Sequence, residues 1–457
     1  MISRTVLAVG VFLIANALQP TYAQVGTNPW PKPRPLGAGI PVYKPPADTA
    51  ATAVTVPSEE LRAISLGTAL ALALANNPDL AARGWEVRAA EGRILQSGLM
   101  PNPEIGLEIE NFGGSAERRG FVGAEATLQL SQLVELAGKR KKRQRVAQAG
   151  QVVTGWEYES ERLEVYTATT KAFFNVLVAQ TLVELKQRQL ELAGSVLETV
   201  RERVAAGRVT QLEETKARVE ASGSRIALQR ARRELDTAHG QLVATWGGRP
   251  GSFGSAEGSL DALIAPPPLN AILQQLSENP NVRRWEAENA LRRSELALEQ
   301  ARQVPDITVS MGVRRYEDTD DNAVVAGISI PLPLFGLNPG GVIVAERRLP
   351  QGRAFGEAAI SQVTRAARQA YNALSAVYSE LRSLTDEILP GAQQAYEAAQ
   401  TGYREGRFGL LDVLDAQRTL FEARTRYVES LGAYHGIRAD LEQLTGHALS
   451  ETAAASR

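Results

Sequence analysis

Residues 103–110 read Pro-Glu-Ile-Gly-Leu-Glu-Ile-Glu, and residues 305–312 read Pro-Asp-Ile-Thr-Val-Ser-Met-Gly. Both stretches alternate apolar and polar side chains, which is the period of a β-strand with one buried face. The second stretch begins 202 residues after the first, and Asn77-Pro78 recurs as Asn279-Pro280 at the same offset. Short solenoid repeats have much shorter periods. The chain is therefore predicted to be one large structural unit duplicated in tandem.

Two β-hairpins are predicted, one in each copy, over residues 104–131 and 305–332. In the first copy a second alternating run covers residues 122–130, and glycines lie between the two runs at positions 113, 114 and 120. In the second copy the runs are separated by the polar segment 318–322. Alternating runs joined by such turn residues are typical of hairpins.

Long helices are predicted after each hairpin, over residues 132–204 and 209–246 in copy one and 341–403 and 410–444 in copy two. Residues 132–204 contain no proline, and about 70 helical residues would span roughly 105 Å. The triplets Ala206-Gly207-Arg208 and Glu405-Gly406-Arg407 break the helices at an offset of 199. Heptad spacing in the returning helix of copy two indicates supercoiled packing; it relates Val413, Leu420, Tyr427, Tyr434 and Leu441.

The remaining segments are assigned from composition. Residues 1–23 resemble a secretory signal, with Arg4, an apolar run over 6–18 and small residues before a cleavage point. The proline-rich residues 24–58 are predicted to be an extended, poorly ordered arm. Repeat 1 is assigned to 59–258, repeat 2 to 259–446, and a tail to 447–457.

Composition excludes several classes of function. The 457 residues include no cysteine and only three histidines, at positions 239, 435 and 447, and the net charge is −1. Thiolate or histidine-pair metal sites are therefore not expected, and the charge does not favour a nucleic-acid partner. No nucleophile motif or phosphate-binding loop is present. We expect no catalytic residue, no cofactor and no bound metal, and thus a protein that is not an enzyme.

The hairpins imply association. Each hairpin has an apolar side without a helix of its own to cover it, and isolated hairpins are marginal in water. In an outer membrane the apolar side can contact lipid, but lipid does not tolerate an open sheet edge. Four strands do not close, whereas three copies supply twelve. The predicted fold is mainly α with a small β part: a homotrimer whose long helices form an α-barrel and whose strands form a 12-stranded β-barrel.

A specific stretch, residues 403–417, reads Tyr-Arg-Glu-Gly-Arg-Phe-Gly-Leu-Leu-Asp-Val-Leu-Asp-Ala-Gln. Together with the duplication, the Asn-Pro pairs and the hairpins, it resembles the TolC family of outer-membrane efflux channels over residues 59–446. The resemblance implies a passive exit duct in the outer membrane of a Gram-negative cell, with a long periplasmic extension. It further implies a periplasmic adaptor and an inner-membrane pump as partners.

Within that family, residues 128–140 and 330–335 resemble the cobalt–zinc–cadmium efflux branch. This resemblance implies an RND-type pump and divalent heavy-metal cations as the substrate. An alternative is that the same channel serves drugs, small organic molecules or type I secretion. A different class of protein, a periplasmic adaptor or coiled-coil scaffold, also has long helices. Two equivalent copies, each with a β-hairpin followed by long helices, argue against this class.

The resemblance also implies functional residues at the helix tips. Acidic side chains at a constriction correspond to Asp412 and Asp415, and a tyrosine of the gate corresponds to Tyr403. Glu213 is the equivalent of Asp412 in copy one, at the offset of 199. An acid in the first turn of a helix also simply complements the helix dipole, and this alternative stays open. Tips that dock the adaptor correspond to Gly207, Arg208, Gly406, Arg407 and Phe408; an ordinary interhelical turn is the alternative.

Two departures from the family pattern matter. Phe408 stands where the best-known relative has a basic gate partner, with Arg407 one residue earlier. Pro350 falls inside the predicted helix 341–403, where it removes one helix hydrogen bond and is expected to kink or break the helix.

Overall fold

The fold is that of a computed structural model, which describes residues 30–31, 34–46, 61–249, 251 and 253–449. The predicted signal segment 1–23 lies outside these residues. The chain divides into two compact units. Among the described residues, unit 1 contains Trp30, Val87–Thr154 and Ala287–Arg353, and unit 2 contains 31–86, 155–286 and 354–449. Each unit therefore takes residues from both predicted repeats.

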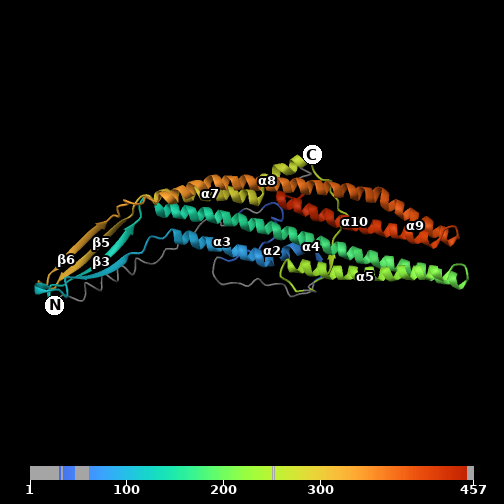
Figure 1. Cartoon of the computed structure of the whole chain (residues 1–457), viewed down its shortest axis with the longest axis horizontal. Helices are drawn as coiled ribbons and strands as arrows, with labels where there is room; N and C mark the ends of the chain where they lie inside the picture. The colour runs from blue at the N-terminus through green and yellow to red at the C-terminus, as the bar shows by residue number, and fades with distance from the viewer. Residues whose placement is uncertain (1–29, 32–33, 47–60, 250, 252, 450–457) are drawn as a thin grey trace. The chain divides into compact units, whose positions relative to one another are not determined.

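Unit 1 is built on a four-stranded antiparallel sheet (Figure 1). Its strands are β2 (Glu104–Glu110), β3 (Glu125–Val134), β5 (Ile307–Tyr316) and β6 (Asn322–Ser329), in the order β2-β3-β5-β6. The short 3-10 helix η1 (Ala116–Arg118) lies in the first hairpin turn. The β3–β5 pair joins the hairpin of copy one to that of copy two, with Leu128 opposite Val313 and Leu130 opposite Met311. The sequence predicted both hairpins but not this pairing between them.

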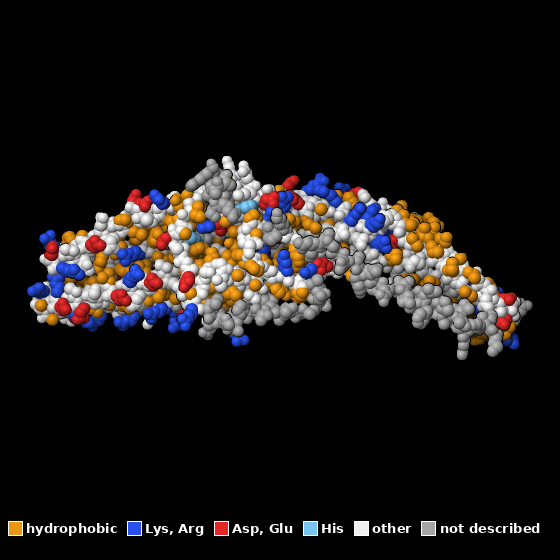
Figure 2. Space-filling model, turned by 180° about the vertical axis from the view of Figure 1, so that it is seen from behind, with side chains coloured by type: hydrophobic (Ala, Val, Ile, Leu, Met, Phe, Trp, Pro, Cys, Tyr) orange, Lys and Arg blue, Asp and Glu red, His pale blue; other side chains and the backbone are white. Residues whose placement is uncertain are grey.

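The sheet has one apolar face, and this face is exposed. Cross-strand partners in the register are apolar on the same side across all four strands. Hydrophobic side chains consequently gather over the strands of unit 1 in Figure 2. The exposed members are Ile105, Leu107, Ile109, Leu128, Leu130, Val309, Met311, Val313, Val324 and Ile328.

The opposite face is polar and internally paired. The guanidinium of Arg314 donates to Glu125 (2.9 Å) and to the hydroxyl of Thr127 (2.9 Å), and it pairs with Glu110 (3.2 Å). These three partners lie on β2 and β3, whereas Arg314 lies on β5. The contacts therefore tie the two hairpins together across the sheet's polar side.

Helices enter and leave the sheet through α3 (Pro78–Ser97), α4 (Lys139–Ala205), α7 (Pro280–Ala301) and α8 (Pro339–Ser383). The start of α4 is fixed by Lys139, whose ammonium donates to the Asp306 carboxylate (2.7 Å) and to the Val304 carbonyl (2.6 Å). The start of α8 is fixed by Asn338, whose amide donates to the Glu299 carboxylate (2.6 Å). Both helix starts are thus attached to the segment that leads from α7 into β5.

Unit 2 contains most of the helical mass. In addition to parts of α3, α4, α7 and α8 it holds α2 (Leu66–Asn76), α5 (Gln211–Ala244), α6 (Leu269–Gln275), the 3-10 turn η2 (Leu276–Glu278), α9 (Leu389–Arg404) and α10 (Leu410–Thr445). The helices α9 and α10 run side by side (Figure 1). Two apolar clusters form the core, one including Phe173, Leu242 and Leu441 and one including Val200, Tyr396 and Leu420. Within the described ranges, no helix has the length and apolar character needed to cross a bilayer.

A two-stranded parallel sheet in unit 2 was not predicted. It pairs β1 (Leu61–Ser65) with β4 (Phe253–Glu257), with Ile64 opposite Ala256. Both of these side chains are buried in the larger apolar cluster. Strands this short, paired almost 200 residues apart, leave no periodic signal to find in the sequence.

The repeated Asn-Pro pairs have the same structural role in both copies. The side-chain amide of Asn77 donates to the carbonyl oxygen of Thr245 (2.9 Å), and that of Asn279 donates to the carbonyl oxygen of Leu444 (2.9 Å). Each asparagine also accepts a backbone N–H at the start of the helix that follows it. One residue therefore caps a starting helix and satisfies a carbonyl at the end of a returning helix.

The expected break at Pro350 does not occur. Helix α8 is continuous from Pro339 to Ser383 with Pro350 inside it. One missing hydrogen bond in a helix of 45 residues is tolerated when the bonds on either side persist. The irregularity lies instead at the π-turn η3 (Leu384–Ile388), directly before Pro390. There the amide of Leu389 donates to the carbonyl oxygen of Leu384, a wider turn that suits a following proline ring.

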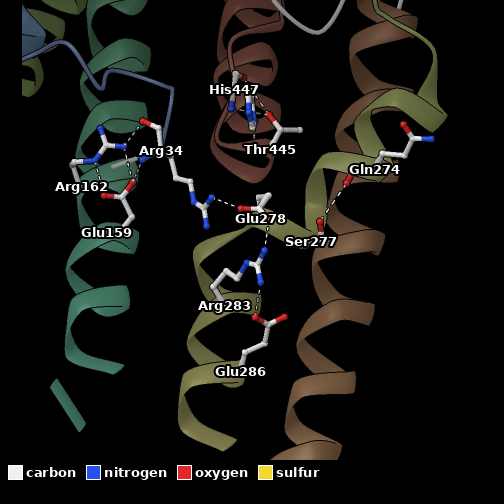
Figure 3. Close-up of polar contacts among 10 residues, drawn as sticks. All are labelled: Arg34, Glu159, Arg162, Gln274, Ser277, Glu278, Arg283, Glu286, Thr445 and His447. Carbon is white, nitrogen blue, oxygen red and sulfur yellow. Dashed lines mark hydrogen bonds and ion pairs between the residues drawn. The ribbon is translucent and has the colours of Figure 1, made fainter. Parts of the chain in front are cut away.

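The expectation of a poorly ordered proline-rich arm is wrong for residues 34–46. Leu36 is only 4% exposed, its amide donates to the carbonyl oxygen of Gly446 (2.9 Å), and that of Tyr43 donates to the carbonyl oxygen of Leu74 (3.0 Å). Figure 3 shows Arg34 between Glu159 of α4 and Glu278 of η2. The segment therefore connects elements of both repeats within unit 2.

Candidate functional site

The candidate site is formed by the two helical turns of unit 2 that connect α4 to α5 and α9 to α10. Gly207 and Gly406 have φ angles of +68° and +79°, the left-handed conformation that favours glycine. The amides of Arg208 (2.9 Å) and Arg407 (2.7 Å) each donate to the carbonyl oxygen five residues earlier. This is the Schellman closure of a helix end. The two turns, 199 residues apart, are thus closed by the same backbone geometry.

Tyr403 joins the two turns. Its side chain is 6% exposed, and its hydroxyl donates to the Glu213 carboxylate at the start of α5 (3.5 Å). Arg203 of α4 donates to the Tyr403 carbonyl oxygen (3.0 Å) and lies 4.5 Å from the centre of its ring. Burial raises the pKa of the Tyr403 hydroxyl, so it remains protonated and donates at neutral pH. Arg203, Glu213 and Tyr403 form what we call the Tyr403 cluster.

Asp412 and Asp415 have separate local partners. The Asp412 carboxylate accepts the backbone N–H of Gly409 (2.8 Å), which is a helix cap at the start of α10. Asp415 pairs with Arg418 on the same helix (2.8 Å), and both side chains are mostly exposed. No hydrogen bond or ion pair between described residues joins either aspartate to the Tyr403 cluster. The structure thus brings together Glu213 and Tyr403, two of the four predicted constriction residues.

The predicted docking residue Phe408 packs over Gly402. A side-chain carbon added at Gly402 would lie 2.2 Å from the Phe408 ring, so any larger residue there would displace the ring. Phe408 nevertheless remains 49% exposed, and with Arg407 it borders a groove of about 510 Å³ along α9. Arg407 itself pairs with Glu405 (3.1 Å). The second turn therefore presents an aromatic ring and a charged pair, whereas the first turn has Val209 in place of Phe408.

Two contributors to the site were missed by the sequence. Arg203 carries the cation–π contact with Tyr403, yet its equivalent in copy two is Gly402, so the repeat gives no signal for it. Glu214 pairs with Arg218 (2.5 Å) and Arg201 (3.4 Å) beside the first turn, and the hydrogen bond from Arg218 lowers the pKa of its carboxyl. Among the residues that the structure describes, no group of three or more His, Cys, Asp or Glu side chains is placed to hold a metal ion.

The chain matches a known family over most of its length. The model of the family described as outer membrane efflux protein matches residues 69–248 and 271–447. These two matched stretches fall on the two copies of the duplicated unit. They also include both Asn-Pro pairs and both turns of the candidate site.

Individual relatives agree with this match. The chain is 34% identical over 418 residues to the cobalt-zinc-cadmium resistance protein CzcC of Cupriavidus metallidurans, covering 90% of this chain and 98% of that protein. Its fold is similar to that of a membrane protein from Pseudomonas aeruginosa (TM-score 0.74, 18% identity, 89% of this chain and 99% of that one). It is also similar to the fold of CusC (TM-score 0.72, 18% identity, 89% of this chain and 99% of that one). These structures confirm the mainly α fold with a small β part.

Proposed function

The chain belongs to the outer membrane efflux protein family, and from this premise we propose that it is the exit duct of a tripartite system that exports divalent heavy-metal cations. The observation that supports a metal substrate is the similarity to the cobalt-zinc-cadmium resistance protein over nearly the whole of both chains. The protein is an outer-membrane efflux channel. Its inner-membrane partner in this proposal is an RND-type pump, reached through a periplasmic adaptor.

The sheet of unit 1 supports a barrel built from several copies. Its edge strands β2 and β6 are each paired on one side only, and such edges are not tolerated against lipid. The exposed apolar face suits outer-membrane lipid, and the polar face, with its Arg314–Glu125 contact, suits a wet lumen. Three copies would supply twelve strands, enough for an open lumen. We therefore retain the homotrimer as the proposed assembly.

The helical turns are proposed to form the periplasmic end of the duct. The Tyr403 cluster links α4, α5 and α9 by a hydrogen bond and a cation–π contact, which suits a latch that must part when the duct opens. The turns at Gly207-Arg208 and Gly406-Arg407-Phe408 are the proposed adaptor contacts. The exposed Phe408 ring and the adjoining groove support this assignment for the second turn.

The test is deletion of the encoding gene in its Gram-negative host. We expect sensitivity to zinc, cobalt and cadmium to increase, and the wild-type gene to restore tolerance. An unchanged metal tolerance combined with a new sensitivity to drugs would replace the metal substrate by organic molecules and keep the channel. A purified protein that fails to conduct ions in a planar bilayer would overturn the channel itself.

Charge at the periplasmic turns is expected to affect ion preference. Replacing Asp412 and Asp415 together by asparagine keeps a capping oxygen for the Gly409 N–H but removes two charges per chain. If the aspartates line the constriction, the cation-to-anion permeability ratio falls, by about two- to threefold, because rings of acidic side chains favour cations. Reversal potentials in a salt gradient across a planar bilayer measure this ratio. An unchanged ratio would leave Asp412 with the capping role alone.

A further inference from the structure

The loop that joins β6 to α8 in unit 1 exposes a group of large apolar side chains. Residues 330–337 read Ile-Pro-Leu-Pro-Leu-Phe-Gly-Leu, and we call them the junction loop. Single exposed apolar side chains are ordinary, but a contiguous group in one loop indicates contact with another molecule or a membrane. The exposed members are Ile330, Leu332, Leu334, Phe335 and Leu337, with exposed fractions from 49% to 101%.

The apolar surface of the junction loop continues that of the sheet. Apolar residues at positions 330, 332 and 334 keep the alternation by which Val324 and Ile328 of β6 are exposed. On the other side of the loop, Ile343 and Val344 of α8 are 54% and 50% exposed. Figure 2 shows hydrophobic side chains gathered where the sheet of unit 1 meets its helices, next to basic side chains. The junction loop therefore borders the face of the sheet that is proposed to contact lipid.

Basic side chains follow this apolar surface on two helices of unit 1. Lys141 and Arg145 lie one turn apart near the start of α4, and Arg347 and Arg348 lie near the start of α8; all four are exposed. We call these four residues the basic group. No side-chain hydrogen bond or ion pair joins any of them to another residue that the structure describes. At 1.5 Å per residue they lie roughly 3–14 Å beyond the helix starts.

The carboxylates of the same part of unit 1 are mostly paired with other cations. The pairs are Glu135 with Arg143, Asp306 with Lys139 and Glu299 with Arg302. The exposed Glu346 offsets one charge of the basic group. The surface therefore keeps a net positive charge beside exposed apolar side chains. This is the arrangement by which proteins bind anionic head groups at the surface of a bilayer.

We propose that the junction loop inserts into the periplasmic leaflet of the outer membrane and that the basic group binds the phosphates of anionic phospholipids there. The starts of α4 and α8 are both attached to the segment between α7 and β5, through Lys139 and Asn338. The two basic pairs are therefore held at one level beyond the sheet, and long Lys and Arg side chains reach head groups from there. The inference rests on the proposed function only in placing the apolar face of the sheet in lipid.

A spin label on the junction loop tests its insertion. The sequence contains no cysteine, so a nitroxide attached to Leu334→Cys reports this position alone in the full chain. The labelled channel is reconstituted into vesicles of phosphatidylethanolamine and phosphatidylglycerol. We expect collisions with oxygen, which concentrates in hydrocarbon, to exceed collisions with a water-soluble nickel complex. The same label at Gln351→Cys, an exposed position farther along α8, is the control and is expected to show the reverse order.

Other results of the spin-label experiment would overturn the insertion. A label at position 334 that collides mainly with the nickel complex, in a channel that conducts, would place the loop in water and leave the proposed function intact. Few collisions with either reagent, together with broadening by neighbouring labels, would assign the loop to a contact between copies. A purified chain that does not conduct at all would instead contradict the proposed function.

Lipid retention tests the preference for an anionic head group. The wild-type protein is reconstituted with equal amounts of phosphatidylglycerol and phosphatidylcholine and re-extracted in mild detergent, and its bound lipid is measured by mass spectrometry. We expect phosphatidylglycerol to be enriched about fivefold or more, because one Lys or Arg near an anionic surface contributes a factor of about this size. Equal retention of the two lipids by the wild-type protein would overturn the role of the basic group.

Charge variants assign the preference to particular residues. Arg347→Gln with Arg348→Gln is expected to lower the enrichment of phosphatidylglycerol, and adding glutamine at both basic-group positions of α4 is expected to abolish it. The matched control, Arg225→Gln with Arg233→Gln, removes the same charge from exposed positions of α5 and is expected to retain the wild-type enrichment. An equal loss in the control would show a response to net charge alone and would overturn the assignment.

Discussion

Replacing Gly312 with alanine is expected to prevent assembly of the channel in the outer membrane. A side-chain carbon at this position would lie 2.4 Å from the carbonyl oxygen of Leu128 and 2.9 Å from the Cα atom of Gln129. Both are backbone atoms of β3, which cannot rotate away. Because β3–β5 is the pairing that joins the two hairpins, relief of the clash separates the sheet into two halves. We expect the cost to exceed the ~1–3 kcal/mol of ordinary overpacking.

The measurement is the amount of oligomer in the outer-membrane fraction, read as heat-modifiable bands on a gel, together with metal tolerance of the complemented deletion strain. Gly106→Ala is the matched control. It lies on the same face of the same sheet, but a side chain there meets only the flexible Gln129 side chain at 3.5 Å, so near-normal assembly is expected. Normal assembly of the Gly312 variant would show that the β3–β5 register is not the one that forms in the membrane.

The strands and turns were accessible from the sequence because their signals are local. The alternation over residues 307–313 reflects the two faces of a single strand. This pattern does not depend on which strand pairs beside it. Gly207 and Gly406 mark left-handed helix ends, a backbone requirement that a few consecutive residues satisfy by themselves. Because the unit is duplicated, each of these patterns occurs twice in the sequence. The apolar face of the sheet followed directly from these patterns.

The candidate site was only partly accessible because its contacts are between distant residues of unlike copies. Tyr403 was identified through a resemblance, and Glu213 through the repeat, but Arg203 has no counterpart in the second copy. Its cation–π contact with Tyr403 depends on how the helix pair α4–α5 packs against the helix pair α9–α10. The pairing of β1 with β4, and the attachment of Leu36 to Gly446, are likewise long-range. No period within either segment indicates them.

The effect of Pro350 depends on the length of the helix that contains it. A proline inside a helix removes one hydrogen bond, and taken alone it predicts an interruption. In α8 the neighbouring turns on both sides remain bonded, and the helix continues to Ser383. The π-turn η3 lies more than 30 residues later, before Pro390. The consequence of a proline therefore depends on the helix around it.

Removing the Arg162 guanidinium is expected to destabilise unit 2 more than any surface change. Arg162 is 1% exposed and pairs with Glu159, whose side chain is 2% exposed (2.8 Å). Its remaining N–H groups donate to the carbonyl oxygens of Leu36 (2.9 Å) and Arg34 (3.4 Å) in the N-terminal arm. In Arg162→Met the Glu159 carboxylate stays buried without its charged partner and keeps the backbone N–H of Arg34 (2.7 Å) as a donor. Breaking a buried pair in this way typically costs about 3–5 kcal/mol.

Urea unfolding of the protein in detergent, followed by far-ultraviolet circular dichroism, measures the loss of stability, and protease cleavage within residues 34–46 reports release of the arm. The double variant Arg162→Met with Glu159→Leu is the decisive control. It removes the buried, uncompensated charge of Glu159 and is expected to recover much of the unfolding free energy. Apolar replacement of a buried ion pair often leaves stability unchanged or increases it. The arm, however, is expected to stay protease-sensitive in the double variant, since the donors to the carbonyl oxygens of Leu36 and Arg34 and the acceptor of the Arg34 N–H are all gone. Full protection of the arm in either variant would mean that Arg162 does not hold it, and that Leu36–Gly446 and Tyr43–Leu74 suffice.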